Sequence, residues 1–255
     1  MSYRVEPIPA FKDNYIWGLR EGGSAAVVDP GDAQPVLEWL ARERLQLVAI
    51  LITHHHADHI GGIPALLEKF SVPVHGPIGE EIPTLTNRVG GGEAIRVPEI
   101  GADFAVIDVP GHTRAHIAYY GAGHLFCGDT LFACGCGRLF EGTPEQMHRS
   151  LAQLAALPGD TRVYCAHEYT MSNIAFARAV EPGNAALAAR EQSDAALRRE
   201  NRPTVPSTIA AELATNPFMR AAQPEVAAAA SKRLGKPVSD PVEVFAAIRG
   251  WKNEF

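Results

Sequence analysis

The chain has 255 residues, of which 46% are hydrophobic and 20% are charged, with a formal net charge of −6 at pH 7. This composition is typical of a globular protein with one or two domains. Nucleic acid is disfavoured as a partner, because binding its phosphates needs a basic surface. No stretch approaches the roughly 18 consecutive apolar residues of a membrane span, and the opening MSYRVEPIPAF lacks the apolar segment of a secretory signal. We therefore expect a cytoplasmic protein that binds neither nucleic acid nor membranes.

From the N-terminus to about residue 167, short β-rich runs alternate with glycine and proline turns. The predicted strands lie at residues 25–31, 47–53, 73–76, 104–111, 116–120, 124–129 and 162–167. Gly121-Ala122-Gly123 between two of them predicts a tight hairpin turn. Helices are predicted at 62–70 and 144–157, the second opened by a capping box of Thr143 and Gln146.

After Glu168 the pattern changes to alanine-rich helical segments separated by prolines. The segments read IAFARAV, NAALAAREQSDAALRREN, TIAAELA, PEVAAAASKRLG and DPVEVFAAIRGWKNEF. The sequence therefore predicts two domains of the α/β class overall, with an α/β domain at residues 1–167 and a helical domain at 168–255.

The four cysteines do not predict a disulfide framework. Cys127, Cys134, Cys136 and Cys165 are too few and too unevenly spaced for one in a chain of this length. Cys134-Gly-Cys136 resembles half of a zinc site, yet no second cysteine pair exists to complete it. Buried or loop thiols in a reducing compartment are the simpler interpretation.

Residues 53–62 read THHHADHIGG, so four histidines and one aspartate occupy the six positions 54–59. A purification tag would be terminal and unbroken, whereas this run is internal and interrupted. An apolar strand precedes it and a double glycine follows it. These features favour a metal site over a chance cluster on a solvated loop.

The same pattern recurs at three other strand ends, where His112, Asp129 and His167 follow apolar runs. Strand ends in layered folds share one rim of the sheet, so these side chains could converge. Seven nitrogen and oxygen ligands are too many for one tetrahedral ion and suit two ions with a bridging carboxylate. The candidate ligands are His54, His56, Asp58, His59, His112, Asp129 and His167.

This ligand pattern resembles the signature of the metallo-β-lactamase fold superfamily. Within that superfamily, CGDTLFACGCGRLFEGT at 127–143, YCAHEYTMSNIAFARAVEPGN at 164–184, NPFMR at 216–220 and the closing RGWKNEF are similar to glyoxalase II, the hydroxyacylglutathione hydrolases. The resemblance implies an αββα sandwich of the metallo-β-lactamase type, followed by a C-terminal α-helical substrate-binding domain.

The resemblance also implies a ligand assignment and a reaction. His54, His56 and His112 would hold one metal, Asp58, His59 and His167 the other, and Asp129 would bridge them. A hydroxide held between the ions would attack the thioester carbonyl, with Asp58 orienting it, so no protein nucleophile is required. Two divalent ions per chain are expected, zinc being favoured and iron or manganese also suiting these donors.

Glutathione recognition is likewise implied by the resemblance. The matching positions are Arg138, Phe140, Tyr169, Arg249 and Lys252. Arg138 stands where lysine is frequent in the family, and Phe140 where tyrosine is frequent, so a hydroxyl hydrogen bond is lost there. The expected activity is hydrolysis of S-2-hydroxyacylglutathione, typically S-D-lactoylglutathione, in the second step of methylglyoxal detoxification. A monomer is expected.

Two other interpretations and two other residues stay open. The chain could be a related enzyme, such as a glutathione persulfide dioxygenase, or a non-catalytic metal-binding module. His55, between two candidate ligands, is interpreted as a supporting or solvent-facing residue rather than a ligand. Asp29 could accept a hydrogen bond from a ligand histidine, or could only form the turn before Pro30-Gly31.

Overall fold

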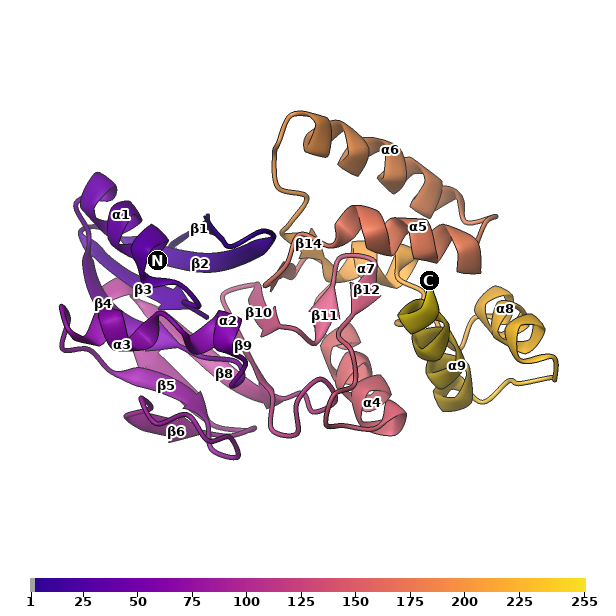
Figure 1. The fold of residues 1–255 in the computed structure, drawn as a ribbon, viewed down its shortest axis with the longest axis horizontal. Helices are drawn as coiled ribbons and strands as arrows, with labels where there is room; N and C mark the ends of the chain where they lie inside the picture. Colours follow the sequence, from indigo (N-terminus) through magenta and orange to yellow (C-terminus); the bar gives the residue numbers. More distant parts are fainter. Residues whose placement is uncertain (1–2) are drawn as a thin grey trace. The chain divides into compact units, whose positions relative to one another are not determined.

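The computed structural model describes residues 3–255, and contacts divide them into two compact units (Figure 1). Unit 1 contains the described residues up to Asp108 together with Arg114–Gly128. Unit 2 contains Val109–Thr113 and Asp129–Phe255. The domain boundary predicted after residue 167 stays a prediction, because these units are defined by contacts and interleave along the chain.

Unit 1 contains two β-sheets. The first has the order β1-β2-β3-β4-β5-β6, antiparallel from β1 to β3 and parallel from β3 to β6. Its strands are β1 Arg4–Ala10, β2 Asn14–Glu21, β3 Ser24–Val28, β4 Gln46–Leu51, β5 Val74–Pro77 and β6 Asn87–Val89. The second is an antiparallel meander in the order β10-β9-β8-β7. Its strands are β7 Ala94–Val97, β8 Ala102–Asp108, β9 Ile117–Gly121 and β10 His124–Gly128, and the 3₁₀ turn η1 Pro98–Ile100 joins β7 to β8.

Helices and side chains join these sheets into layers. Helices α1 (Ala33–Glu43) and α3 (Ile63–Leu67) lie beside the first sheet, where Trp39 and Leu66 are buried with strand residues such as Ile50 (Figure 1). The second sheet is tied to the first by Tyr119, whose hydroxyl donates to the Ile52 carbonyl at 2.9 Å. Apolar burial in these layers places the loop after β4 at a fixed edge of the first sheet.

Unit 2 is mainly helical, with two short strand pairs. Strand β13 (Arg162–Cys165) pairs with β14 (Ser207–Thr208), and β11 (Leu131–Phe132) pairs with β12 (Gly135–Cys136). Its helices are α4 Pro144–Ala155, α5 Thr170–Val180, α6 Ala185–Arg199, α7 Ile209–Thr215, α8 Pro224–Leu234 and α9 Pro241–Glu254. An aromatic cluster packs α5 against α9, with the Phe176 and Phe218 rings stacked at 5.8 Å and Trp251 edge-on to Phe176.

Most predicted elements are confirmed. All seven strand predictions fall on observed strands, the helices after Glu168 form, and Thr143 and Gln146 make both bonds of the capping box. The β9–β10 turn has positive φ at Ala122 and Gly123, as a tight hairpin requires. Strand β14 lies in the region after Glu168 where only helical segments were predicted, because a strand of two residues has no periodicity that a sequence could reveal. No helix within residues 3–255 combines the length and apolarity needed to cross a membrane.

Candidate active site

In unit 1, the loop after β4 and the short helix α2 (Ala57–Ile60) that follows it carry four of the predicted ligands. His54 is fully buried, and its Nδ1 lies 3.1 Å from the Thr53 hydroxyl. Its Nε2 lies 3.1 Å from Nδ1 of His56. The Thr53 hydroxyl fixes the His54 ring, and His54 and His56 then place one nitrogen each at a short separation. Two ligands of one metal ion would have this arrangement.

Asp29 supports this loop from the neighbouring strand end. Its carboxylate accepts hydrogen bonds from the Thr53 backbone N–H at 2.8 Å and from the Thr53 hydroxyl at 2.7 Å. The same carboxylate lies 3.1 Å from Nδ1 of His59. Asp29 also has a positive φ of 53° just before Pro30, so it takes part in the turn as well as facing His59. A carboxylate on Nδ1 orients the ring so that Nε2 can bind a metal.

Asp58 is positioned by its backbone and by an asparagine. Asn14 Nδ2 donates to Asp58 Oδ2 at 2.9 Å, and the same oxygen lies 3.6 Å from His59 Nε2. A Cβ atom at Gly31 would lie only 1.8 Å from the Asp58 carbonyl oxygen, so this close approach requires glycine. Asn14 was not predicted, because nothing in its local sequence distinguishes it from any asparagine that opens a strand.

In unit 2, Asp129 lies between two histidines. His112 Nε2 lies 3.4 Å from Asp129 Oδ2, and His167 Nε2 lies 3.4 Å from Asp129 Oδ1. His112 Nδ1 is 2.9 Å from the Arg138 carbonyl oxygen, which fixes the ring with Nε2 towards Asp129. One carboxylate oxygen therefore faces each imidazole, which is the arrangement a bridging carboxylate needs.

The donor chemistry in both units fits divalent metal ions. His59 and His112 each have an oxygen partner on Nδ1 and turn Nε2 towards another predicted ligand. Nitrogen and carboxylate donors of this kind suit zinc, iron or manganese. The described side chains that form candidate metal-holding groups are His54, His56, Asp58, His59, His112, Asp129 and His167. Their assignment to individual ions stays a prediction.

His55 does not belong to these groups. Its Nδ1 lies 2.9 Å from the carboxylate of Glu80, a residue that is 6% exposed. His116 also has a structural role, because its ring stacks on His54 at 4.5 Å and its Nδ1 lies 3.0 Å from the Ile117 carbonyl oxygen. Both residues therefore support the loop in unit 1.

Unit 2 contains a pocket of about 590 Å³ that brings together all five predicted glutathione-binding residues. Besides these five, the lining includes His112 and Asp129, so the pocket reaches the predicted metal ligands of this unit. The five predicted residues are Arg138, Phe140, Tyr169, Arg249 and Lys252. Phe132, Ser172, Asn173 and Phe255 also line it and were not predicted.

The two cations on α9 differ in how they are held. Arg249 is 5% exposed and donates to the Cys136 carbonyl at 2.9 Å and to Asn253 at 3.0 Å. Lys252 donates to the Ser172 carbonyl at 3.1 Å and lies over the rings of Phe176 and Phe255. Arg249 is thus partly structural, whereas the lysine is a more accessible cation of the pocket.

The surroundings of Lys252 also change its titration. Partial burial, with the positive charges of Arg249 and Arg138 nearby, lowers the pKa of Lys252 to about 8. Its ammonium group therefore loses its proton within an experimentally convenient range of pH.

The cysteines are buried thiols, as predicted. Burial raises the pKa of Cys134 and of Cys165 to about 12. Burial also raises the pKa of Cys136, although Arg249 lies beside it. Thiols with such pKa values are poor nucleophiles at neutral pH, because the thiolate is the reactive form.

Comparison with known proteins places this site in a class. A sequence model described as the metallo-beta-lactamase superfamily matches residues 13–167, and one described as the hydroxyacylglutathione hydrolase C-terminus matches residues 168–255. The fold and the histidine and aspartate groups therefore define a metal-binding protein of the metallo-β-lactamase superfamily, with a C-terminal helical region.

Within that class, the chain belongs to the hydroxyacylglutathione hydrolase family. It is 54% identical to the hydroxyacylglutathione hydrolase of Nitrosomonas eutropha, over 98% of each chain. It is 56% identical to the one from Cupriavidus taiwanensis, over 99% of each chain. The resemblance stated from the sequence is thereby confirmed.

Solved structures agree on the fold. The crystal structure of ETHE1 from Myxococcus xanthus is similar with a TM-score of 0.66 and 26% identity, covering 99% of this chain and 98% of that chain. The BLEG-1 B3 metallo-beta-lactamase is similar with a TM-score of 0.62 and 24% identity, covering 85% of this chain and 99% of that chain. The predicted metallo-β-lactamase fold is confirmed.

The buried thiols lead to a test of whether cysteine takes part in catalysis. We expect iodoacetamide at pH 8 to leave turnover of a glutathione thioester almost unchanged, because all four thiols are buried and because thiols with a pKa of about 12, as at Cys134 and Cys165, are only about one part in 10⁴ thiolate. Mass spectrometry of the treated native protein reports the alkylated positions. Rapid loss of turnover together with stoichiometric alkylation of Cys136 would contradict this account.

Proposed function

We propose that this protein hydrolyses S-2-hydroxyacylglutathione thioesters, typically S-D-lactoylglutathione, to glutathione and a 2-hydroxy acid. The observation that carries the proposal is the pocket of unit 2, which has Arg138, Arg249 and Lys252 on its walls together with His112 and Asp129. A pocket that is lined by cations and adjoins candidate metal ligands suits a thioester that is negatively charged. Relatives named hydroxyacylglutathione hydrolase match over nearly the whole chain, which supports the same reaction.

Two divalent ions are proposed to bind per chain. His54, His56 and His112 would hold one, Asp58, His59 and His167 the other, and Asp129 would contribute one oxygen to each. Zinc is the proposed metal, since nitrogen and carboxylate donors without thiolate suit it, and iron or manganese suit the same set. When bound, such ions activate water at neutral pH and polarise the thioester carbonyl.

The chain's own residues have orienting roles in this proposal. Asp58 would orient the attacking water, and its Oδ2 is held for this by Asn14. Asp29 and the Arg138 carbonyl hold Nδ1 of His59 and His112, which keeps Nε2 of each ring available as a donor atom. No side chain has to form a covalent bond to the acyl group.

Substrate binding would use charge and aromatic packing. Glutathione has two carboxylates, and a protein of net charge −6 needs a local cationic site to hold them. Lys252 and Arg138 would supply it, with Arg249 fixing the pocket wall behind them. Phe140, which is 62% exposed, and Tyr169, which stacks on His167 at 4.6 Å, would contact the tripeptide backbone. We further propose that the protein acts as a cytoplasmic monomer in the second step of methylglyoxal detoxification.

The ligand assignment leads to a test at the proposed bridge. Asp129→Ala should lower the metal content from two equivalents per chain and reduce lactoylglutathione turnover by about 10²-fold or more, because both ions lose a donor. Metal analysis of the purified variant beside steady-state kinetics measures both effects. Asp103→Ala, at an exposed ion pair with Arg96, is the control and should change neither. An Asp129→Ala protein with two tightly held ions and normal turnover would refute the assignment.

The lowered pKa of Lys252 leads to a test of substrate binding. The protonated ammonium binds carboxylate, so KM for lactoylglutathione should rise as pH increases through about 8, by roughly three- to tenfold after solvent screening. Lys252→Arg keeps the charge at higher pH and should flatten this rise. Lys252→Gln should have a high KM at every pH, with normal metal content. If KM for wild type and Lys252→Gln is equal below pH 7, then Lys252 does not bind the substrate.

A further inference from the structure

The β11–β12 hairpin forms part of the pocket wall. Phe132 lies on it, with ring centroids 5.9 Å from His167 and 5.3 Å from Tyr169. Cys136 at its other end offers the carbonyl that Arg249 binds. Both Phe132 and Cys136 line the pocket, so the position of this short hairpin sets the shape of the site.

Two residue pairs in the backbone ladder are too few for the hairpin to hold its own position. Only Leu131↔Cys136 and Phe132↔Gly135 pair in its ladder, and Cys134 at its tip has a positive φ of 55°. An isolated two-stranded ribbon is marginal in water, and a non-glycine residue in the left-handed region costs energy. Contacts from outside the hairpin must therefore fix it.

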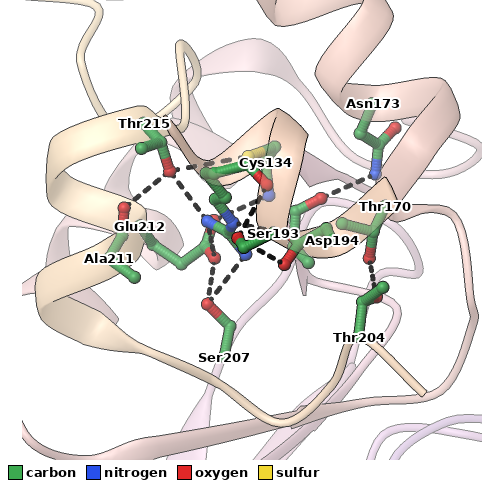
Figure 2. A network of polar contacts seen from close by, with 12 residues as sticks. Cys134, Thr170, Asn173, Ser193, Asp194, Thr204, Ser207, Ala211, Glu212 and Thr215 are labelled. Carbon is green, nitrogen blue, oxygen red and sulfur yellow. Dashed lines mark hydrogen bonds and ion pairs between the residues drawn. The ribbon is translucent and has the colours of Figure 1, made fainter. Parts of the chain in front are cut away.

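Those contacts come from side chains of the helical segments. Glu212 on α7 is 0% exposed, and its Oε2 accepts the Cys134 backbone N–H at 2.8 Å (Figure 2). Asn216 Nδ2, which also donates to Glu212 Oε2 at 2.9 Å, reaches the Gly135 carbonyl at 2.9 Å and the Phe132 carbonyl at 3.2 Å. Asn173 on α5 donates to the Ala133 carbonyl at 3.1 Å. The backbone of residues 132–135 is thus bonded at every residue.

A charged residue fixes Glu212 in turn. Arg190 on α6, whose side chain is 11% exposed, donates from Nη1 to Glu212 Oε1 at 2.7 Å and to the Thr215 hydroxyl at 2.7 Å. The Ser207 hydroxyl also donates to Oε1 of Glu212 (Figure 2). Each oxygen of the Glu212 carboxylate therefore has two donors, and the carboxylate cannot rotate without losing bonds.

The energetics of such a pair favour positioning over stability. Burying an ion pair costs desolvation energy that its attraction only partly offsets, so an apolar core of equal volume is often as stable. A carboxylate with all its hydrogen bonds formed instead fixes the position of the groups that donate to it. For Glu212, one of these groups is the backbone N–H of Cys134. We infer that Glu212, held by Arg190, is a positioning residue that fixes the β11–β12 wall of the pocket for glutathione binding, an inference that rests on the proposed function.

The test compares two buried glutamates. Glu212→Gln keeps the shape but places an amide against Arg190, and it should raise KM for lactoylglutathione about tenfold while kcat stays within about threefold and metal content is unchanged. Amide hydrogen exchange at residues 132–136 should become faster. Glu181→Gln is the matched control, because Glu181 is 3% exposed and makes a bidentate ion pair in the same unit, with its carboxylate bonded to Arg220 instead of to the hairpin. Its KM should stay within about twofold of wild type.

The outcomes are distinct. A folded Glu212→Gln protein with wild-type KM, or an equal rise of KM in Glu181→Gln, would overturn the inference. If Glu212→Gln does not fold, the second variant is Asn216→Ala, which removes two hydrogen bonds to the hairpin and leaves the Arg190–Glu212 ion pair in place. This variant should raise KM severalfold. An unchanged KM would again overturn the inference. Wild-type protein that hydrolyses no glutathione thioester would overturn the proposed function itself, whereas active wild type with unaffected variants would overturn only the role of Glu212.

Discussion

The orientation of buried imidazole rings is the constraint on which the rest of the site depends. A histidine can present Nε2 to a metal only if something holds Nδ1, and a buried ring without such a partner would be costly. In this protein the holders are oxygens of different kinds: the Asp29 carboxylate for His59, the Thr53 hydroxyl for His54 and the Arg138 carbonyl for His112. The turn at Asp29 places its carboxylate beside His59 and Thr53, and the close approach at Gly31 places the Asp58 backbone.

The pocket in unit 2 follows a related rule, in which backbone groups are held by charged side chains. Arg249 uses its guanidinium on the Cys136 carbonyl, and Glu212 uses its carboxylate on the Cys134 amide. These two contacts hold the same short hairpin from its two ends. Lys252 lies on α9 one turn from Arg249 and remains the more accessible cation, with its pKa lowered by partial burial. The structural charge, Arg249, and the proposed substrate-binding charge, Lys252, are therefore distinct residues within one pocket.

The strands, the helices and the candidate metal ligands could be predicted because they depend on local pattern, whereas the sandwich fold was implied by the resemblance to a known family. Apolar runs that end in histidine or aspartate mark strand ends, and the spacing of residues 54–59 is unusual enough to indicate a metal. Strand β1 was missed because Pro7 and Pro9 argue against a strand. The two prolines are tolerated there because β1 lies at the edge of the sheet. Asn14, Phe132 and Glu212 were missed because their roles arise from contacts distant in sequence, as in the 78-residue separation between Cys134 and Glu212.

The central claim, that a two-metal centre hydrolyses glutathione thioesters, is tested most directly by metal titration of the wild-type protein. Protein stripped by a chelator is supplied with zinc in steps, and hydrolysis of S-D-lactoylglutathione is followed by the thiol released. We expect no turnover in the stripped protein and a maximum at two equivalents of zinc per chain. Full turnover without metal, or a maximum at one equivalent, would contradict the account.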